Sequence, residues 1–279
     1  MEYVIWEERP VLRDPVALVA FSGWGDAGAS STLAVDHLID VLAGYRFARM
    51  DSDEFYDFQV RRPQVEIAED DRRRIEWPDV SVHALTVPEA DRDIVVLTGD
   101  EPSVRWKRFS REVAELFESI GVQDVVTLGA FSGQVPHTLP VPLIGIASDP
   151  DLLEPNQLFE SDYEGPTGII GVLNVALANR GMTTMSVWAA VPHYLANQEY
   201  PPGALALLDK ALEVAEIELD TSDLQVDAVD FRSKVDEAVE DSELREYIDD
   251  LEAESLTGEE GVDPAERLVE EIERFLNDG

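Results

Sequence analysis

The 279-residue sequence contains no cysteine, only three lysines, and no apolar run long enough to cross a membrane. Without cysteine the chain has no disulfide framework, no thiolate nucleophile and no cysteine-ligated zinc or iron–sulfur site. A membrane-spanning helix needs about 20 predominantly apolar residues, so no membrane span is expected. The first residues, MEYVIWEERP, do not have the basic and then apolar pattern of a signal peptide. We therefore expect a cytoplasmic protein.

Basic residues are scarce as a class, with 21 lysines and arginines against 59 aspartates and glutamates, a formal net charge of -38. A surface this acidic repels the phosphate backbone of DNA or RNA, so nucleic acid is not an expected partner. Hydrophobic residues make up 44% of the chain, which is enough to form the core of one large domain.

Short apolar runs alternate with amphipathic segments, a pattern that predicts an α/β protein. Strands are predicted at residues 15–21, 45–50, 93–98, 124–131, 140–148 and 183–191. Helices are predicted between Gly28 and Gly44 and at residues 103–120, 167–179 and 202–218. Residues 55–87 alternate and contain prolines, which indicates two or three antiparallel or edge strands. The β-α-β order predicts a three-layer α/β/α sandwich with a mainly parallel central sheet.

The composition changes after residue 220, which predicts a boundary between two domains. The last 59 residues hold 21 acidic and five basic side chains. We predict an α/β/α core domain at 1–220 and an acidic helical extension at 221–279. An apolar stripe at residues 226–251 should lie on the core, on another subunit or on a client protein. A linker at 257–263 and a last helix at 264–276 are predicted beyond it.

A glycine-rich turn follows the first predicted core strand. Gly23, Gly25 and Gly28 form a G-x-G-x-x-G pattern between this strand and a helix, and Asp51 or Asp53 follows a little over twenty residues later. This arrangement is typical of a dinucleotide-binding turn with its ribose-binding acid. An NAD(P)-binding protein is therefore one hypothesis.

Two residues of the same turn argue against a bound dinucleotide. Asp26 lies at the start of the helix, where the pyrophosphate would bind; its carboxylate can cap the helix itself and would repel a phosphate. Trp24 adds bulk to a turn that dinucleotide folds keep small. The other interpretations are a structural corner capped by Asp26, and a pocket or interface corner that exposes Trp24. No G-x-x-x-x-G-K-[ST] pattern occurs, so a nucleotide P-loop is excluded.

Four segments in order carry a family resemblance: GWGDAG at 23–28, LGAFSGQVPHT at 128–138, YEGPTGIIGVL at 163–173 and WAAVPHYL at 188–195. Together they resemble the proteasome assembly chaperone 2 (PAC2) family, in particular its actinobacterial branch, over about residues 1–215. The resemblance implies a sandwich akin to purine nucleoside phosphorylases and a self-associating protein, for which a trimer is one option. The resemblance also implies a role known from eukaryotic and archaeal relatives, which help proteasome α-subunits to assemble. For most bacterial members the activity is unassigned.

Two departures from the family pattern qualify that resemblance. Leu139 follows the Val-Pro-His-Thr loop where relatives tend to have arginine, so anion binding by this loop is not expected. The chain ends Leu-Asn-Asp-Gly, whereas some eukaryotic assembly chaperones dock through a hydrophobic-Tyr-any C-terminus. Docking by that tail is not expected.

The histidines are the first candidates for chemistry. His37 falls within a predicted helix and His83 within a predicted strand, where surface or packing roles are expected. His137 and His193 each follow a proline in a loop after a core strand, where a general acid or base often lies. The alternative is a turn whose imidazole bonds the backbone. Ser132 could pair with His137, although the segment resembles a nucleophile elbow only loosely.

Metal ligands and cofactor motifs are sparse. No H-E-x-x-H pattern and no close histidine pair occurs, so we predict neither a metal site nor a cofactor. Tyr163 and Glu164 precede a predicted helix with Thr167 as its natural cap; an aromatic and an acid in a loop could also recognise a sugar or base. The acidic C-terminal helices are either a solvated face or a protein-binding appendage.

These observations predict a non-enzymatic, homo-oligomeric, assembly-chaperone-like protein that binds other proteins, with proteasome subunits as candidate partners. The alternative is a small-molecule enzyme of nucleoside phosphorylase or hydrolase type, with a pocket where Gly25, Asp26, Gly133, His137 and His193 converge. Its candidate catalytic residues are His137, His193 and Asp26. The candidate pocket or interface residues are Gly23, Trp24, Gly25, Asp26, Gly28, Ser132, Gly133, His137, Tyr163, Glu164, Thr167, His193 and Tyr194.

Overall fold

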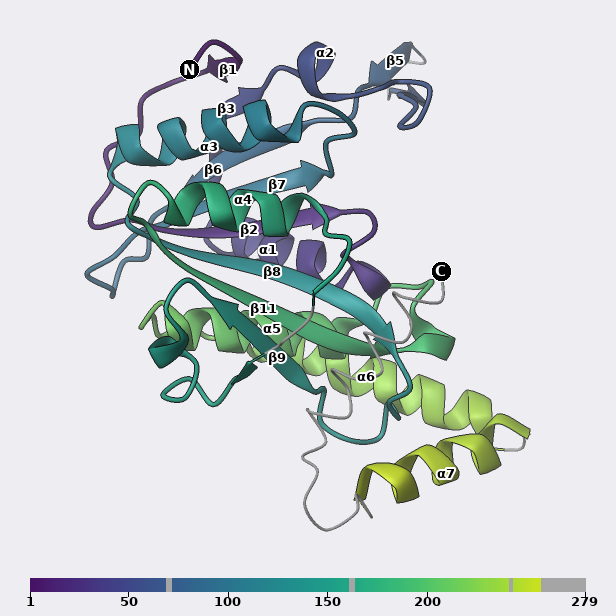
Figure 1. Ribbon diagram of the computed structural model, residues 1–279. Coiled ribbons are helices and arrows are strands. Elements are labelled where there is room, and N and C mark those ends of the chain that lie inside the picture. Colours follow the sequence, from purple (N-terminus) through teal and green to yellow (C-terminus); the bar gives the residue numbers. More distant parts are fainter. Residues whose placement is uncertain (69–71, 161–163, 241–242, 257–279) are drawn as a thin grey trace.

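One nine-stranded sheet lies between two helical layers in the computed structural model, which describes residues 1–68, 72–160, 164–240 and 243–256 (Figure 1). In sheet order the strands are β1 (Val4–Trp6), β3 (Tyr45–Met50), β6 (Val80–Leu85), β7 (Ile94–Asp100), β2 (Val16–Ser22), β8 (Asp124–Gly133), β11 (Thr183–Pro192), β9 (Leu143–Ala147) and β10 (Phe159–Glu160). Helices α1 (Ser30–Val41) and α5 (Pro201–Val214) cover one face, and α3 (Trp106–Ile120) and α4 (Ile169–Ala178) cover the other. This is the predicted α/β/α sandwich.

Strand direction changes across the sheet. The central strands β7, β2, β8 and β11 pair in parallel, whereas β1, β3 and β6 pair antiparallel on one side and β9 pairs antiparallel with β11 on the other. The two or three antiparallel or edge strands predicted in residues 55–87 are β6, an antiparallel strand between β3 and β7, and two strands of a separate hairpin, β4 (Gln64–Ile67) and β5 (Arg73–Glu76). The parallel pairings therefore form the centre of a mixed sheet.

The central strand β2 is buried on both faces, which explains its uninterrupted apolar sequence. Alternate side chains of a strand point to opposite faces. Those that pack toward α1 and α5 are Val16, Leu18 and Ala20, and those that pack toward α3 and α4 are Ala17, Val19 and Phe21. Each face of the sheet therefore has its own apolar core.

The sequence-based prediction missed the shortest elements: β1, β10 and α2 (Ser52–Phe55). Elements of two to four residues do not extend over enough of the sequence to show a period. The structure also places a 3-10 segment, Ala27–Ala29, ahead of α1, and it begins α4 two residues later than predicted.

The C-terminal segment is helical as predicted, with α6 (Ser222–Val239) packed beside α5, and α7 (Glu243–Leu256) following it. Leu224, Val235 and Ile248 of this segment join the same core as α5. The domain boundary at residue 220 stays a prediction, and the predicted linker at 257–263 and helix at 264–276 lie outside the described residues. Within the described residues, no helix combines the length and the apolar character needed to span a bilayer.

Candidate functional site

Two cavities border the carboxyl end of β2. This strand lies between β7 and β8. After β2 the chain continues toward one edge of the sheet, to β3, and after β8 it continues toward the other edge, to β9, so the direction of the connections reverses here. Open α/β sheets bind ligands at such crossover points, beyond the carboxyl ends of their strands. Ser22, the last residue of β2, lines both cavities, and the glycine turn begins directly after it.

The turn needs glycine for its backbone conformation and for close packing. Gly23 and Gly28 have φ angles of +131° and +62°, in the range that residues with a side chain rarely adopt. At Gly28 an added Cβ would lie 2.7 Å from the Cβ of Tyr200. Backbone geometry and packing thus account for these glycines without a bound phosphate.

Asp26 is buried, and its carboxylate caps helix α1. One oxygen accepts hydrogen bonds from the backbone N–H and the hydroxyl of Ser31, at 2.7 and 2.6 Å, and the other accepts from the hydroxyl of Thr32 at 2.6 Å. The carboxylate therefore fills the helix N-terminus where a dinucleotide pyrophosphate would bind. Asp51, a candidate ribose-binding acid, instead accepts from the backbone N–H of Asp53 at the start of α2.

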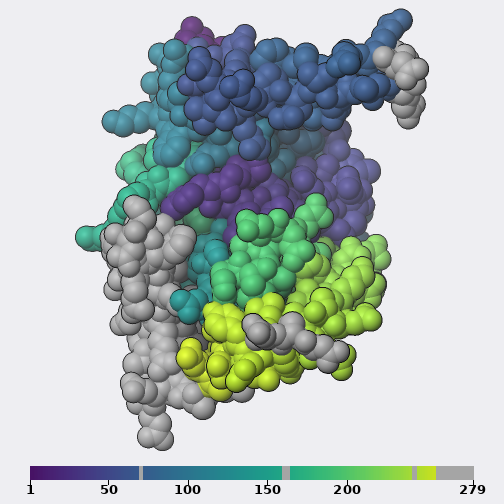
Figure 2. All heavy atoms as spheres, turned by 90° about the vertical axis from the view of Figure 1, so that its right-hand side faces the viewer, coloured from purple at the N-terminus to yellow at the C-terminus, as the bar shows by residue number. Residues whose placement is uncertain are grey.

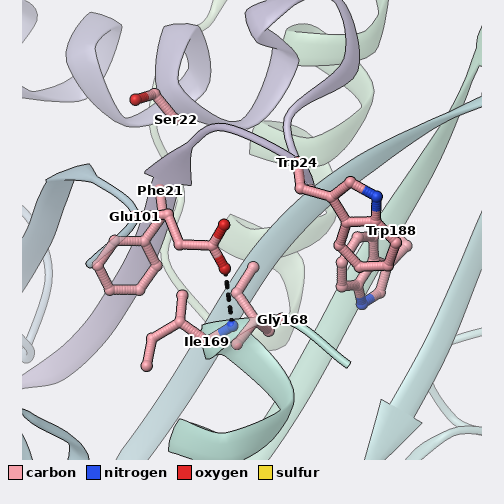
Figure 3. Close-up of a pocket in the computed structure, with 9 residues that line it drawn as sticks. Phe21, Ser22, Trp24, Glu101, Gly168, Ile169 and Trp188 are labelled. Carbon is pink, nitrogen blue, oxygen red and sulfur yellow. Dashed lines mark hydrogen bonds between the residues drawn. The ribbon is translucent and has the colours of Figure 1, made fainter. Parts of the chain in front are cut away.

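The smaller cavity lies between the glycine turn and the N-terminus of α4 (Figure 3). Its volume is about 10 Å³, which leaves room for about one water molecule. It is lined by Phe21, Ser22, Trp24, Gly25, Glu101, Gly168, Ile169, Ile170 and Trp188. A cavity of this size does not hold a nucleoside.

Glu101 provides the polar contact in the smaller cavity. Its carboxylate accepts a hydrogen bond from the backbone N–H of Ile169 at 2.9 Å, drawn as a dashed line in Figure 3, and so caps α4. Thr167, the cap predicted from sequence, is exposed, and its hydroxyl lies 3.5 Å from the carbonyl of Gly168. The prediction of the Thr167 cap was wrong because the carboxylate that caps the helix comes from a loop 68 residues earlier.

Two tryptophans, Trp24 and Trp188, are among the residues that line this cavity (Figure 3). Trp188 is held in place, since its indole N–H donates to the hydroxyl of Ser186 at 3.0 Å and an added Cβ at Gly129 would lie 2.5 Å from its ring. Trp24 is 56% exposed. Tryptophan is enriched at protein-contact surfaces and among the residues that contribute most to binding.

The larger cavity, about 780 Å³ and open to solvent, lies among α1, the carboxyl end of β7 and the β4–β5 hairpin. Arg61 forms an ion pair with Asp100 at its wall. Asp79 also lines it; burial raises the pKa of this carboxyl, and its Oδ1 has no hydrogen-bond partner among the described residues. The sequence-based prediction missed this cavity because its walls come from five separated segments of the chain.

His137 is fully buried, and both of its ring nitrogens are engaged. Its backbone N–H donates to the hydroxyl of Tyr194 at 3.0 Å, that hydroxyl lies 2.8 Å from Nδ1, and Nε2 lies 3.2 Å from Oδ1 of Asp236. This network is satisfied when Tyr194 donates to Nδ1 and a neutral imidazole donates from Nε2 to Asp236. Burial lowers the pKa of His137, and the carboxylate of Asp236 on α6 opposes that effect.

His193 lies at the surface beside the same cluster. Its ring meets those of Tyr194 and Tyr247 edge to face, with centroids 5.3 and 5.6 Å apart. Burial raises the pKa of Tyr194 to about 12, so this phenol stays protonated at neutral pH. The two candidate histidines thus lie together, in contact with the C-terminal helices.

Among the described residues, the remaining candidates do not form a catalytic group with the histidines. The ring nitrogens of His137 face Tyr194 and Asp236 rather than Ser132, which pairs with Val191 between β8 and β11. Gly133 is buried and Glu164 is exposed, while Tyr163 lies outside the described residues. Within the described residues, no three His, Asp or Glu side chains are grouped so that they could hold a metal ion.

A family model described as the PAC2 family matches residues 20–239. This chain belongs to the PAC2 family. The four sequence motifs thus indicated the correct family. All four lie within the matched residues, which make up most of the chain.

Solved structures support the PAC2 assignment. A PAC2 family protein from Streptomyces avermitilis is 42% identical to this chain, with a TM-score of 0.77 over 84% of this chain and 99% of that one. A Mycobacterium tuberculosis proteasome-assembly chaperone homologue is 36% identical, with the same TM-score and coverage. A Mycobacterium tuberculosis protein of unknown function is 28% identical, with a TM-score of 0.85 over 96% of each chain. The comparison with curated proteins finds no match.

Proposed function

We propose that this PAC2 family protein is a non-enzymatic, assembly-chaperone-like protein that binds other proteins as a homo-oligomer, with proteasome subunits among its partners. The 36% identity to a proteasome-assembly chaperone homologue supports a chaperone-like role. A trimer is one oligomer that we consider.

The observation that carries the proposal is the closed hydrogen-bond network of His137. The imidazole is buried, and its two nitrogens lie against Tyr194 and Asp236. A general base must reach the proton that it removes from a substrate, either directly or through one water. Asp26 is likewise occupied at the start of α1. Two of the three catalytic candidates, His137 and Asp26, are thus engaged in hydrogen bonds within the fold.

Trp24 is the candidate contact residue. It is exposed at the carboxyl edge of the sheet, and a tryptophan that becomes fully covered in a complex contributes more binding free energy than most other residues. We therefore assign partner binding to the surface formed by Trp24 and Trp188.

The test is affinity purification of the tagged, full-length protein from its native cell, followed by mass spectrometry of the bound proteins. We expect 20S proteasome subunits with the wild type and at least several-fold less of them with Trp24→Ala. Val11→Ala is the matched control, because Val11 is an exposed apolar residue that precedes β2 whereas Trp24 follows it. If the wild type brings down no 20S subunit, the proteasome link is wrong.

A second candidate function, small-molecule binding, is favoured by the larger cavity and the unpartnered oxygen of Asp79. Native mass spectrometry of the purified protein tests it. A ligand retained in stoichiometric amount by the wild type and by Glu89→Gln, but lost from Asp79→Asn, would favour an enzyme or small-molecule-binding protein. Absence of any retained ligand would favour the protein-binding function.

A further inference from the structure

The β4–β5 hairpin extends away from the body of the molecule (Figures 1 and 2). One of its faces is mainly apolar. The strand register pairs Val65 with Ile75 and Ile67 with Arg73, and paired residues share a face. We call Val65, Ile67, Arg73 and Ile75 the hairpin face. Its three apolar side chains are 55%, 68% and 49% exposed, in chain order.

An exposed apolar face on a two-stranded hairpin needs a partner surface. A lone hairpin is marginally stable in water, and grouped exposed apolar side chains mark contact sites in soluble proteins. The hairpin is therefore a projecting element whose apolar face would be covered by another molecule.

Charge narrows the kind of partner. Residues 60–78 contain five arginines and five acidic residues, whereas the whole chain has a net charge of -38. On the hairpin face the charged residue is Arg73, while Gln64, Glu66, Arg74 and Glu76 lie on the opposite face. The hairpin face is therefore apolar and cationic, and it complements a surface that is apolar and acidic.

Helix α6 presents such a surface on its outer side. Val226 and Val229, 58% and 57% exposed, are three residues apart and adjacent on the helix. Asp223 and Asp230 are exposed and lie beside Val226, three residues before it and four after it. We call these four residues the α6 face. The buried residues of α6 lie on its other side, against the core.

The hairpin and α6 lie at opposite ends of the same molecule (Figure 1), so the hairpin cannot cover its own α6 face. We propose that the hairpin face of one copy docks on the α6 face of a second copy. The two valines of the α6 face then pack against the valine and the two isoleucines of the hairpin face, and Arg73 lies beside Asp223 and Asp230. This inference rests on the self-association in the proposed function and names the two surfaces that produce it.

The proposed contact joins two different surfaces, which makes it heterologous. Each molecule in a pair then retains one unused hairpin face and one unused α6 face. Repetition of the contact gives a closed ring if the rotation between copies closes, and an open chain if it does not.

Sedimentation of the full-length protein over a range of concentrations tests the contact. We expect the wild type to sediment as an oligomer. The hairpin variant Val65→Ser/Ile75→Ser and the α6 variant Val226→Asp/Val229→Asp should each weaken association about ten-fold or more, because they remove apolar burial. Val175→Ser, at an exposed apolar residue of α4, is the matched control and should sediment like the wild type. Circular dichroism checks that each variant is folded.

Mixing the two variants tests the heterologous geometry. The hairpin variant retains an intact α6 face and the α6 variant retains an intact hairpin face, so an equimolar mixture should form a one-to-one heterodimer. Arg73→Glu alone should weaken association, and Arg73→Glu with Asp230→Arg in the same chain should restore it.

The outcomes separate this inference from the broader proposal. A wild type that is monomeric at every concentration overturns both the self-association and this contact. A wild-type oligomer that both variants leave intact, or a mixture that forms no heterodimer, overturns this contact alone.

Discussion

The Asp26 carboxylate accepts hydrogen bonds from two backbone N–H groups and two hydroxyls at the start of α1. These donors are partly or fully buried, so they have no equivalent partner in solvent when the carboxylate is removed. A capping carboxylate also interacts favourably with the positive end of the helix dipole. Asp26 is therefore a stabilising residue of the fold.

Asp26→Ala should lower the free energy of unfolding by about 2–3 kcal/mol, since it leaves the hydroxyls of Ser31 and Thr32 without their acceptor. Chemical denaturation followed by tryptophan fluorescence measures the change. Asp40→Ala, on the exposed side of the same helix, is the control and should change stability by less than about 0.5 kcal/mol. Equal effects of the two substitutions would contradict the capping role.

His137 couples stability to pH. Its surroundings include Tyr194, Asp236, Arg245 and Glu252, and burial lowers its pKa below the ordinary value of about 6.5. The native state therefore binds fewer protons at this site than the unfolded chain as the pH falls below about 6.5. The stability that neutral His137 contributes is fully present above that pH and is lost progressively on acidification.

His137→Asn should remove this dependence. We expect the free energy of unfolding of the wild type to fall more steeply between pH 7.5 and 5.5 than that of the variant, although the variant is less stable at pH 7.5. His37→Asn on α1 provides the comparison and should keep the steep wild-type slope. Parallel curves for the wild type and His137→Asn would show that this imidazole does not titrate as described.

At the scale of elements, contacts between distant segments fix the helices at the carboxyl edge of the sheet. Glu101, just after β7, caps α4, and His137, in the loop after β8, contacts α6 through Asp236. Each contact joins a loop at the sheet edge to a helix that follows much later in the chain. These contacts tie α4 and α6 to the loops at the carboxyl ends of the central strands, where Trp24 is exposed.

Glu101→Ala should lower the free energy of unfolding by about 1 kcal/mol and speed hydrogen exchange in the first turn of α4, because the N–H of Ile169 loses its acceptor. Glu101→Gln keeps an acceptor oxygen, so its free energy of unfolding and its exchange rate should lie between those of the wild type and Glu101→Ala. Hydrogen-exchange mass spectrometry resolves the local effect. Glu164→Ala, at an exposed acid before the same helix, should leave exchange unchanged.

At the scale of the whole molecule, the net charge of -38 determines which polymers can approach. The field of an acidic protein repels nucleic acid over distances comparable to the Debye length. The same electrostatic field opposes self-association, because each copy carries the same net negative charge. A docking surface with few acidic residues, such as the hairpin face, reduces this repulsion.

We expect no binding of a fluorescent DNA or RNA oligonucleotide by anisotropy at about 0.1 M salt. Binding that weakens steeply with added salt would contradict this expectation. Arg73→Glu would then test whether the hairpin is the site of that binding.

The sequence alone was sufficient for the strands buried on both faces and for the family. β2, β7, β8 and β11 have apolar runs long enough to identify. The motif at residues 23–28 directly follows β2, and the motif at 128–138 runs from β8 into the loop after it. The Asp26 cap was also predictable, because a cap acts within a few residues of its helix. Local patterns of this kind do not depend on the rest of the fold.

Only the tertiary structure decided the partners of Glu101 and His137, the large cavity and the exposure of the hairpin. The hydrogen bond of Glu101 spans 68 residues, and that of His137 to Asp236 spans 99. Contacts between such distant residues leave no periodic signal in the sequence, since they arise when the sheet brings loop ends to one edge. The sequence pattern thus determined which segments are buried, because burial follows from local apolar runs. Tertiary contacts determined which polar side chains are engaged in hydrogen bonds within the fold.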